Sequence, residues 1–161
     1  MKVSIEWLNE WVDAGWDAAT LASRLTMAGL EVEGVEPACP PFSGVVVGEV
    51  VSCERHPDAD KLTVCRVEDG SGSPLQVVCG APNVRPGLRS AFARVGAVLP
   101  GGLKIKRAKL RGVESAGMLC SARELGLGEG HEGILELPGE LAAGTDLRAA
   151  LALDDAILEV N

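Results

Sequence analysis

Apolar and polar positions in the first 35 residues follow two helical patterns and then one strand pattern. We expect a short helix capped by Ser4 that runs through residue 12, with its apolar side chains on one face. A second helix is predicted from its N-cap Asp17 through residue 28. The alternation over 30–35 then predicts a strand.

After this strand the sequence pattern changes to many short apolar runs, typical of strands, separated by glycine and proline. Prolines at 37, 40 and 41 cannot continue a helix or strand, so we predict a domain boundary at 39/40. The turn-like residues 69–72 predict a hairpin, and Gly48 indicates a bend or bulge. Ser121 could cap one helical turn. Strands are expected at 45–51, 62–67, 75–79, 90–93, 97–99, 103–106 and 134–137.

These patterns predict an α+β fold. About five main strands, kinked by glycine, suit a five-stranded OB-type β-barrel over residues 40–151. After a short helix near Thr145, the segment 157–160 reads as a strand that could pair with 30–35. The barrel would then be inserted into a small, incomplete α/β domain formed by residues 1–39 and continued by 152–161.

Charge is distributed unevenly along the 161 residues. The net charge is −8, yet residues 40–120 hold 11 Lys and Arg against 7 Asp and Glu, a local charge of +4. No apolar run reaches the roughly 20 residues that span a bilayer, and the start lacks a signal peptide's apolar core. The five cysteines form no Cys-x-x-Cys pair. A reduced cytoplasmic protein is expected, with zinc or disulfides as the alternative.

The densest charge is a cationic run over residues 104–111, five cations in eight residues without an acid. It could be a solvated strand edge, where lysine blocks edge pairing, or a stripe that contacts phosphates. The alternation places Ile105 on one face and its two lysine neighbours on the other. The members of the run are Lys104, Lys106, Arg107, Lys109 and Arg111.

No catalytic or metal-binding pattern stands out. Asp58 and Asp60 have calcium-like spacing, but no loop glycine and no distal glutamate follow, so the segment 56–62 reads as a capped turn. A Cys120–His131 nucleophile is conceivable on chemical grounds alone. No Walker loop, Gly-x-Ser-x-Gly or metalloprotease helix is present. We therefore expect no catalytic residue, no metal and no cofactor in this chain.

Several segments, taken together and in this order, resemble the tRNA-binding OB domain that several synthetases and free tRNA-binding proteins share. The lead-in and one later segment are similar to the bacterial phenylalanine–tRNA ligase β subunit, so the resemblance covers nearly the whole chain. The first group is His56–Leu62, Cys79–Asn83 and Arg111–Met118. The second is Met1–Trp11, Leu25–Glu33 and Ser121–Leu127.

This resemblance implies that the chain is the N-terminal, non-catalytic part of a longer β subunit. It implies an α2β2 enzyme that joins phenylalanine to its tRNA with ATP and magnesium, with the active site on the α subunit. The expected partners are tRNA and the α subunit. Binding to a membrane or to DNA is not expected. Editing and anticodon contacts would lie in later domains of the subunit.

We predict that the barrel contacts the tRNA backbone largely without regard to sequence, because rings for stacking on bases are scarce. All three tryptophans lie in the first 16 residues, and there is no tyrosine. The alternatives are a scaffold or subunit-contact module with little RNA affinity, and a free-standing tRNA-binding OB protein. Besides the cationic run, the predicted RNA-contacting residues are Lys61, Asn83 and Ser115, which lie in the motifs of the resemblance.

Overall fold

Most residues of regular structure lie in β-strands, and the helices are few and short. The computed structural model describes all 161 residues. They form a terminal unit, Met1–Cys39 with Ala152–Asn161, and a central unit, Pro40–Leu151. No helix is both long and apolar enough to cross a membrane. The two ends of the chain therefore build one unit, and the middle of the chain builds the other.

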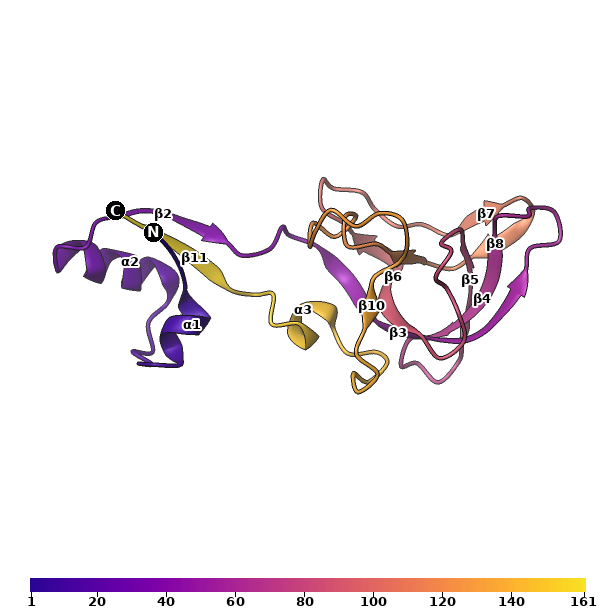
Figure 1. Cartoon of the computed structure of the whole chain (residues 1–161), viewed down its shortest axis with the longest axis horizontal. Helices are drawn as coiled ribbons and strands as arrows, with labels where there is room; N and C mark the ends of the chain where they lie inside the picture. Colours follow the sequence, from indigo (N-terminus) through magenta and orange to yellow (C-terminus); the bar gives the residue numbers. More distant parts are fainter. The chain divides into compact units, whose positions relative to one another are not determined.

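The terminal unit contains a three-stranded antiparallel sheet in the order β1-β11-β2. Its C-terminal strand lies between the two N-terminal strands, and the Met1 amino group donates to the Val160 carbonyl at 2.7 Å (Figure 1). The predicted pairing of 157–160 with 30–35 is thus present, and β1 is an additional strand. The elements are β1 (Lys2–Ser4), α1 (Ile5–Asn9), α2 (Ala18–Met27), β2 (Val32–Pro37) and β11 (Ala156–Val160).

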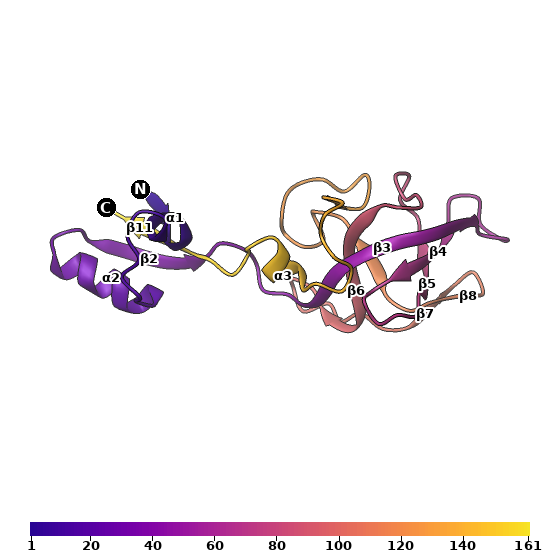
Figure 2. The same cartoon turned by 90° about the horizontal axis from the view of Figure 1, so that it is seen from below.

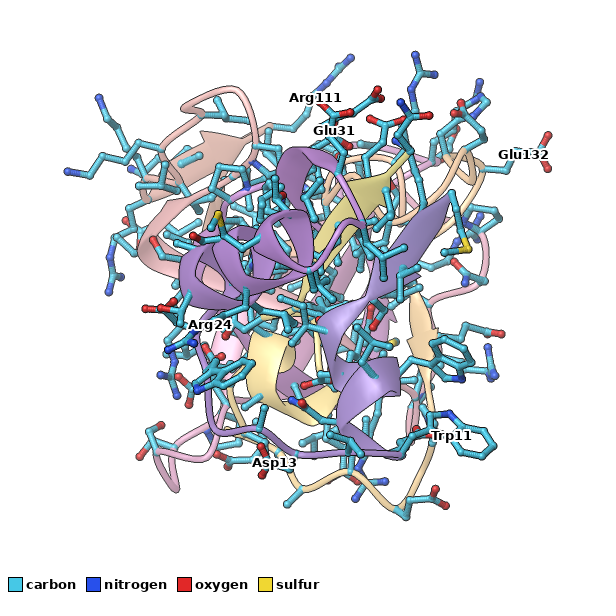
Figure 3. The ribbon with its side chains drawn as sticks, turned by 90° about the vertical axis from the view of Figure 1, so that its left-hand side faces the viewer. Trp11, Asp13, Arg24, Glu31, Arg111 and Glu132 are labelled. Atoms are coloured by element: carbon cyan, nitrogen blue, oxygen red, sulfur yellow. The ribbon has the colours of Figure 1, made fainter.

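Both helices of the terminal unit begin where their capping residues predict. Ser4 Oγ accepts from the Trp7 N–H at 3.1 Å, and Asp17 Oδ1 accepts from the Thr20 N–H at 2.7 Å, which satisfies an otherwise unpaired donor in each first turn. The first helix is shorter than expected and ends at Asn9. Trp11 lies beyond it, 74% exposed, with its ring pointing away from the ribbon (Figure 3).

The central unit is built on an antiparallel sheet in the order β10-β6-β3-β4-β5, with β9 also paired to β6. This sheet curls into a half-barrel, consistent with an OB-type fold (Figures 1 and 2). β7 and β8 form a separate hairpin. The elements are β3 (Ser43–Arg55), β4 (Thr63–Glu68), β5 (Leu75–Cys79), β6 (Arg89–Val98), β7 (Ala108–Leu110), β8 (Val113–Ser115), β9 (Met118–Cys120), β10 (Glu136–Leu137) and α3 (Leu147–Ala150).

Phe92 is fully buried in the core of the central unit, and two glycines leave room for it. A Cβ on Gly48 would lie 2.7 Å from Phe92 Cβ, and one on Gly117 would lie 2.5 Å from Phe92 Cζ. Gly48 therefore leaves room for the Phe92 side chain, and the register is regular at this residue, so the predicted bulge is not found there. The register of β3 shifts instead near Gly44 and Val51.

Two strand predictions in the central unit need correction. Residues 90–93 and 97–98 belong to one strand, β6, which continues through Gly96 although this glycine has a positive φ of 94°, and Leu99 lies just beyond the strand. Residues 103–106 form no regular strand, and only an isolated bridge joins Lys104 to Val98. The Ile105 N–H donates to the Ala97 carbonyl, and the Ile105 carbonyl accepts from the Gly96 N–H, both at 2.8 Å. The hairpin between β4 and β5, in contrast, is confirmed with its turn at 69–72.

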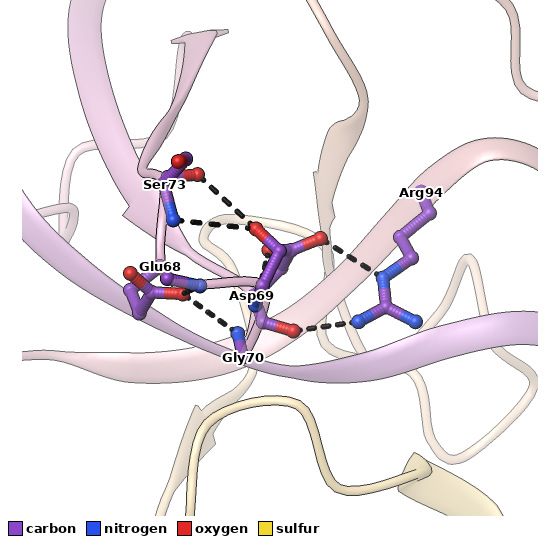
Figure 4. A network of polar contacts seen from close by, with 7 residues as sticks. Glu68, Asp69, Gly70, Ser73 and Arg94 are labelled. Atoms are coloured by element: carbon purple, nitrogen blue, oxygen red, sulfur yellow. Dashed lines mark hydrogen bonds and ion pairs between the residues drawn. The ribbon is translucent and has the colours of Figure 1, made fainter.

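A buried carboxylate organises this turn (Figure 4). Arg94 donates from Nε to Asp69 Oδ2 at 3.0 Å and from Nη2 to the Asp69 carbonyl oxygen at 2.6 Å. The Ser71 N–H donates to Asp69 Oδ1 at 3.1 Å. Burial opposes ionisation of Asp69, but the bonds from Ser71 and Arg94 outweigh it and hold the pKa of this carboxyl below its ordinary value.

We expect Asp69→Asn to lower the free energy of unfolding at pH 7 by roughly 1–3 kcal/mol, because a charge-assisted pair is lost. Because folding lowers the pKa of this carboxyl, its ionised form stabilises the native state fully at any pH above the ordinary pKa of 3.8. This stabilisation is lost as the pH falls from 3.8 through the lower pKa of the folded state. Urea unfolding of both proteins, followed by circular dichroism, should show a difference that narrows near pH 3. A difference that stays constant between pH 7 and pH 3 would contradict this account.

Candidate nucleic-acid interface

The β7–β8 hairpin presents two of the cations at a tight turn. Leu110 pairs with Val113, which leaves Arg111 and Gly112 as a two-residue loop. Both loop residues have positive φ, 53° and 85°, as a type I′ turn requires. Arg111 is therefore held at the tip of the hairpin, and its side chain points outward (Figure 3). Lys109 lies on the same hairpin and is exposed.

The other three cations of the run precede this hairpin on an extended segment. Ile105 is buried, 7% exposed, and its backbone is bonded to β6, so its neighbours Lys104 and Lys106 are directed to solvent. The alternation predicted for these residues is therefore present without a regular strand. Arg107 follows and is also exposed. All five cations are thus accessible to a ligand.

None of the five cations takes part in an ion pair. The ion pairs of the structure include those of Lys2 with Glu36, Arg85 with Glu136, Arg89 with Glu49, and Arg94 with Asp69. Lys109 faces Glu114 across the hairpin, but no ion pair forms between them. The positive charge of the run therefore remains available to an anion, which is what contact with phosphates requires.

Buried His56 fastens the loop 56–62 to the hairpin. Its Nδ1 accepts from the Asp58 N–H at 3.0 Å, and its Nε2 lies 2.7 Å from the Leu110 carbonyl oxygen. A neutral ring with its proton on Nε2 satisfies both partners. The clamp brings Lys61 and Arg111 to the walls of one open pocket of about 450 Å³.

Replacing His56 by alanine should cost roughly 1–3 kcal/mol of stability, because two hydrogen bonds are lost and their backbone partners remain. Amide hydrogen exchange in residues 108–115 should accelerate as well. His131→Ala is the matched control: this histidine is exposed, and we expect its loss to change stability by less than about 0.5 kcal/mol. Equal effects of the two substitutions would contradict the clamp.

Two of the predicted RNA-contacting residues use their polar atoms within the fold. Asn83 donates to the Ile134 carbonyl at 2.9 Å and accepts from the Ile134 N–H at 3.0 Å. Ser115 is buried; its Oγ accepts from the Val78 N–H at 3.0 Å and donates to the Gly117 carbonyl at 2.9 Å. These side chains hold loops in place, and they do not join the exposed cations.

Cys120 and His131, which the sequence offers as a nucleophile and its base, lie in different environments. Burial, and then Glu124, raise the pKa of the Cys120 thiol to about 12, and its complete burial keeps it out of reach of a substrate. His131 is exposed and contacts the Glu129 carbonyl at 3.2 Å. No group of three or more His, Cys, Asp or Glu side chains is arranged to hold a metal ion.

Comparison with known proteins identifies the class of this module. Residues 45–146 match the family described as "Putative tRNA binding domain", and the chain belongs to this family. All 161 residues align with phenylalanine–tRNA ligase β subunits, at 61% identity with that of Bordetella parapertussis and 60% with that of Pseudomonas fluorescens. The chain spans 20% of the length of these relatives.

Two solved structures also align with this chain at 24% identity. A MetRS-related protein from Pyrococcus horikoshii gives a TM-score of 0.47, over 64% of this chain and 87% of that one. The C-terminal domain of Plasmodium vivax p43 gives a TM-score of 0.45, over 63% of this chain and 57% of that one.

Proposed function

We propose that the central unit, residues 40–151, is a five-stranded OB-type barrel that binds tRNA mainly through its sugar–phosphate backbone. The observation that carries this proposal is the run of five exposed cations without ion pairs. Lys61, at the clamped loop, extends the same surface. The contacting residues are Lys61, Lys104, Lys106, Arg107, Lys109 and Arg111, whereas Asn83 and Ser115 hold backbone segments of the central unit in place.

Hydrogen bonds at the open edge of the half-barrel support closure of the barrel. The Ala116 N–H donates to the Gln76 carbonyl on β5 at 2.8 Å, and the Val78 N–H donates to Ser115 Oγ at 3.0 Å. The same chain segment continues into β9, which pairs with β6. A path of backbone contacts thus leads from β5 back to β6. The two-part fold then consists of this barrel and the small α/β domain formed by residues 1–39 and 152–161.

The scarcity of available rings favours backbone contact over stacking on bases. Phe42 and Phe92 are the only aromatic residues of the central unit, and both are buried. Stacking of one base on an exposed ring contributes about 1–3 kcal/mol, and this surface presents no ring for it. Charge must therefore supply most of the binding free energy, and discrimination between base sequences should be weak.

Binding of fluorescently labelled tRNA to the 161-residue chain, followed by anisotropy, tests this function. We expect saturable binding at low salt, competed by any folded tRNA and little affected by the identity of its anticodon. Absence of binding at low salt would overturn the proposal and leave a scaffold or subunit-contact role for the central unit.

We further propose that the chain acts as the N-terminal, non-catalytic part of a cytoplasmic phenylalanine–tRNA ligase β subunit, on the basis of its similarity to such subunits. The α subunit would then be its protein partner, in an α2β2 assembly. ATP and magnesium would serve the whole enzyme from sites elsewhere, since the residues of this chain provide no cluster of metal ligands.

In an assembled enzyme that carries neutral residues at Lys104, Lys106 and Lys109, the KM for tRNA should rise while kcat stays unchanged.

A further inference from the structure

Two cysteines on neighbouring strands of the central unit lie directly opposite each other. Cys53 on β3 pairs in register with Cys65 on β4, and their Sγ atoms are 3.7 Å apart. Directly opposed residues of antiparallel strands have Cα atoms about 4.5–5.5 Å apart, within the range that a disulfide bridges. A small rotation of the side chains would therefore bring the two sulfur atoms to bonding distance.

The two thiols differ in their access to solvent. Cys53 is half-buried, whereas Cys65 is fully buried. Burial, and then the neighbouring Cys53, raise the pKa of the Cys65 thiol well above its ordinary value, so Cys65 stays protonated. An oxidant that approaches from solvent therefore reaches Cys53 first. Cys65 is then placed to resolve the oxidised product.

We propose that Cys53 and Cys65 form a cross-strand dithiol that a peroxide converts into an intramolecular disulfide. The Cys53 thiolate attacks one peroxide oxygen, the O–O bond breaks, and a sulfenic acid forms with release of hydroxide. The Cys65 sulfur then bonds to Cys53 Sγ, the S–O bond breaks, and the Cys65 proton leaves with the departing hydroxyl as water. Two thiols lose two electrons and two protons in total, and the peroxide is reduced to two waters.

The disulfide would constrain the loop between β3 and β4, because Cys53 and Cys65 lie on these two strands. The bond would close the segment 54–64, which contains the His56 clamp and Lys61. It would thus fix the base of the loop that borders the cationic run. Formation of the disulfide does not depend on the proposed RNA binding; only its relevance to RNA contact rests on that function. A failure to form the disulfide would therefore leave the proposed tRNA binding untouched, and a failure to bind tRNA would leave the disulfide proposal untouched.

Peptide mapping of the 161-residue chain tests the proposal. The chain is treated with hydrogen peroxide, its remaining thiols are alkylated, and it is digested with trypsin without a reductant. We expect the count of free thiols to fall from five to three and to return to five with dithiothreitol. Trypsin releases Cys65 in peptide 62–66 and Cys53 in peptide 25–55, which also contains Cys39. A Cys39→Ser background therefore assigns the bond to Cys53 without ambiguity.

The controls separate this pair from the other cysteines. Cys53→Ser should abolish the loss of thiols, whereas Cys120→Ser, at a buried thiol outside the pair, should leave the 62–66 cross-link intact. The mapping of the unsubstituted chain does not depend on the folding of either variant. An unchanged thiol count, a link between Cys65 and Cys79, a disulfide between two chains, or Cys53 oxidised to sulfinic acid without a link would each overturn the proposal.

Discussion

Replacing Lys104, Lys106 and Lys109 together by glutamine should weaken tRNA binding roughly 10- to 100-fold at physiological salt. Each lysine that neutralises a phosphate releases a condensed counterion, so its loss lowers the salt slope of log K by about 0.7–0.9. The triple variant should therefore bind with a slope reduced by about 2–3. Anisotropy titrations at four or more salt concentrations measure both quantities together.

A second triple variant with the same change in net charge serves as the control. Lys2 and Arg85 are ion-paired, and Arg24 lies over the Trp16 ring at 5.2 Å, so all three cations already have partners within the fold. Their replacement by glutamine should change the affinity less than about threefold, because they hold no phosphate. Equal weakening by both triple variants would show that net charge matters and that the cationic run does not.

The second large effect is expected in the core of the central unit. Phe92→Ala should lower the free energy of unfolding by about 3–5 kcal/mol, because it removes a fully buried ring and leaves a cavity between β6 and the glycines at 48 and 117. Such a loss is a large share of the stability of a domain of this size. Urea unfolding followed by circular dichroism suits this test, since all three tryptophans lie in the terminal unit.

Leu103→Ala is the matched control for this core substitution. Leu103 is 58% exposed, and its truncation should change stability by less than about 0.5 kcal/mol. Phe92→Leu keeps most of the buried volume and should fall between the two. A cost below about 1 kcal/mol for Phe92→Ala would contradict the placement of this ring at the centre of the core.

Local signals predicted much of the fold correctly. The caps at Ser4 and Asp17 act through side-chain hydrogen bonds to a backbone N–H three residues further on, so the sequence alone reveals them. The β4–β5 hairpin was equally clear, because two runs of β-branched residues flank a glycine-rich turn. These elements depend on neighbours in the chain, which is the information that a pattern contains.

Features that depend on distant contacts were missed. β1 is three residues long and is ordered by β11, more than 150 residues away. The β7–β8 hairpin has Arg-Gly at its turn and lacks the usual Asn-Gly signal, so the pattern predicts neither of its strands. The role of Gly48 also depends on Phe92, 44 residues further along the chain, whereas the local pattern indicates only a bend or bulge at this glycine.

The sequence predicts the charge of the candidate site, but it does not predict the contacts that hold its loops in place. The cationic run is visible in the sequence, but the freedom of its cations from ion pairs depends on where every acid lies in the fold. The His56 clamp joins residues 54 positions apart and leaves no local signal. The resemblance predicts RNA contact for Asn83 and Ser115, whereas the structure shows that the side chains of both bind backbone groups of other segments.

Binding through charge is tested by the salt dependence of the affinity of the unsubstituted chain for tRNA. If three or four phosphates are neutralised by the exposed cations, log K plotted against log salt should fall with a slope of about −2 to −4. A flat profile, with measurable binding that does not respond to salt, would contradict an interface built on charge.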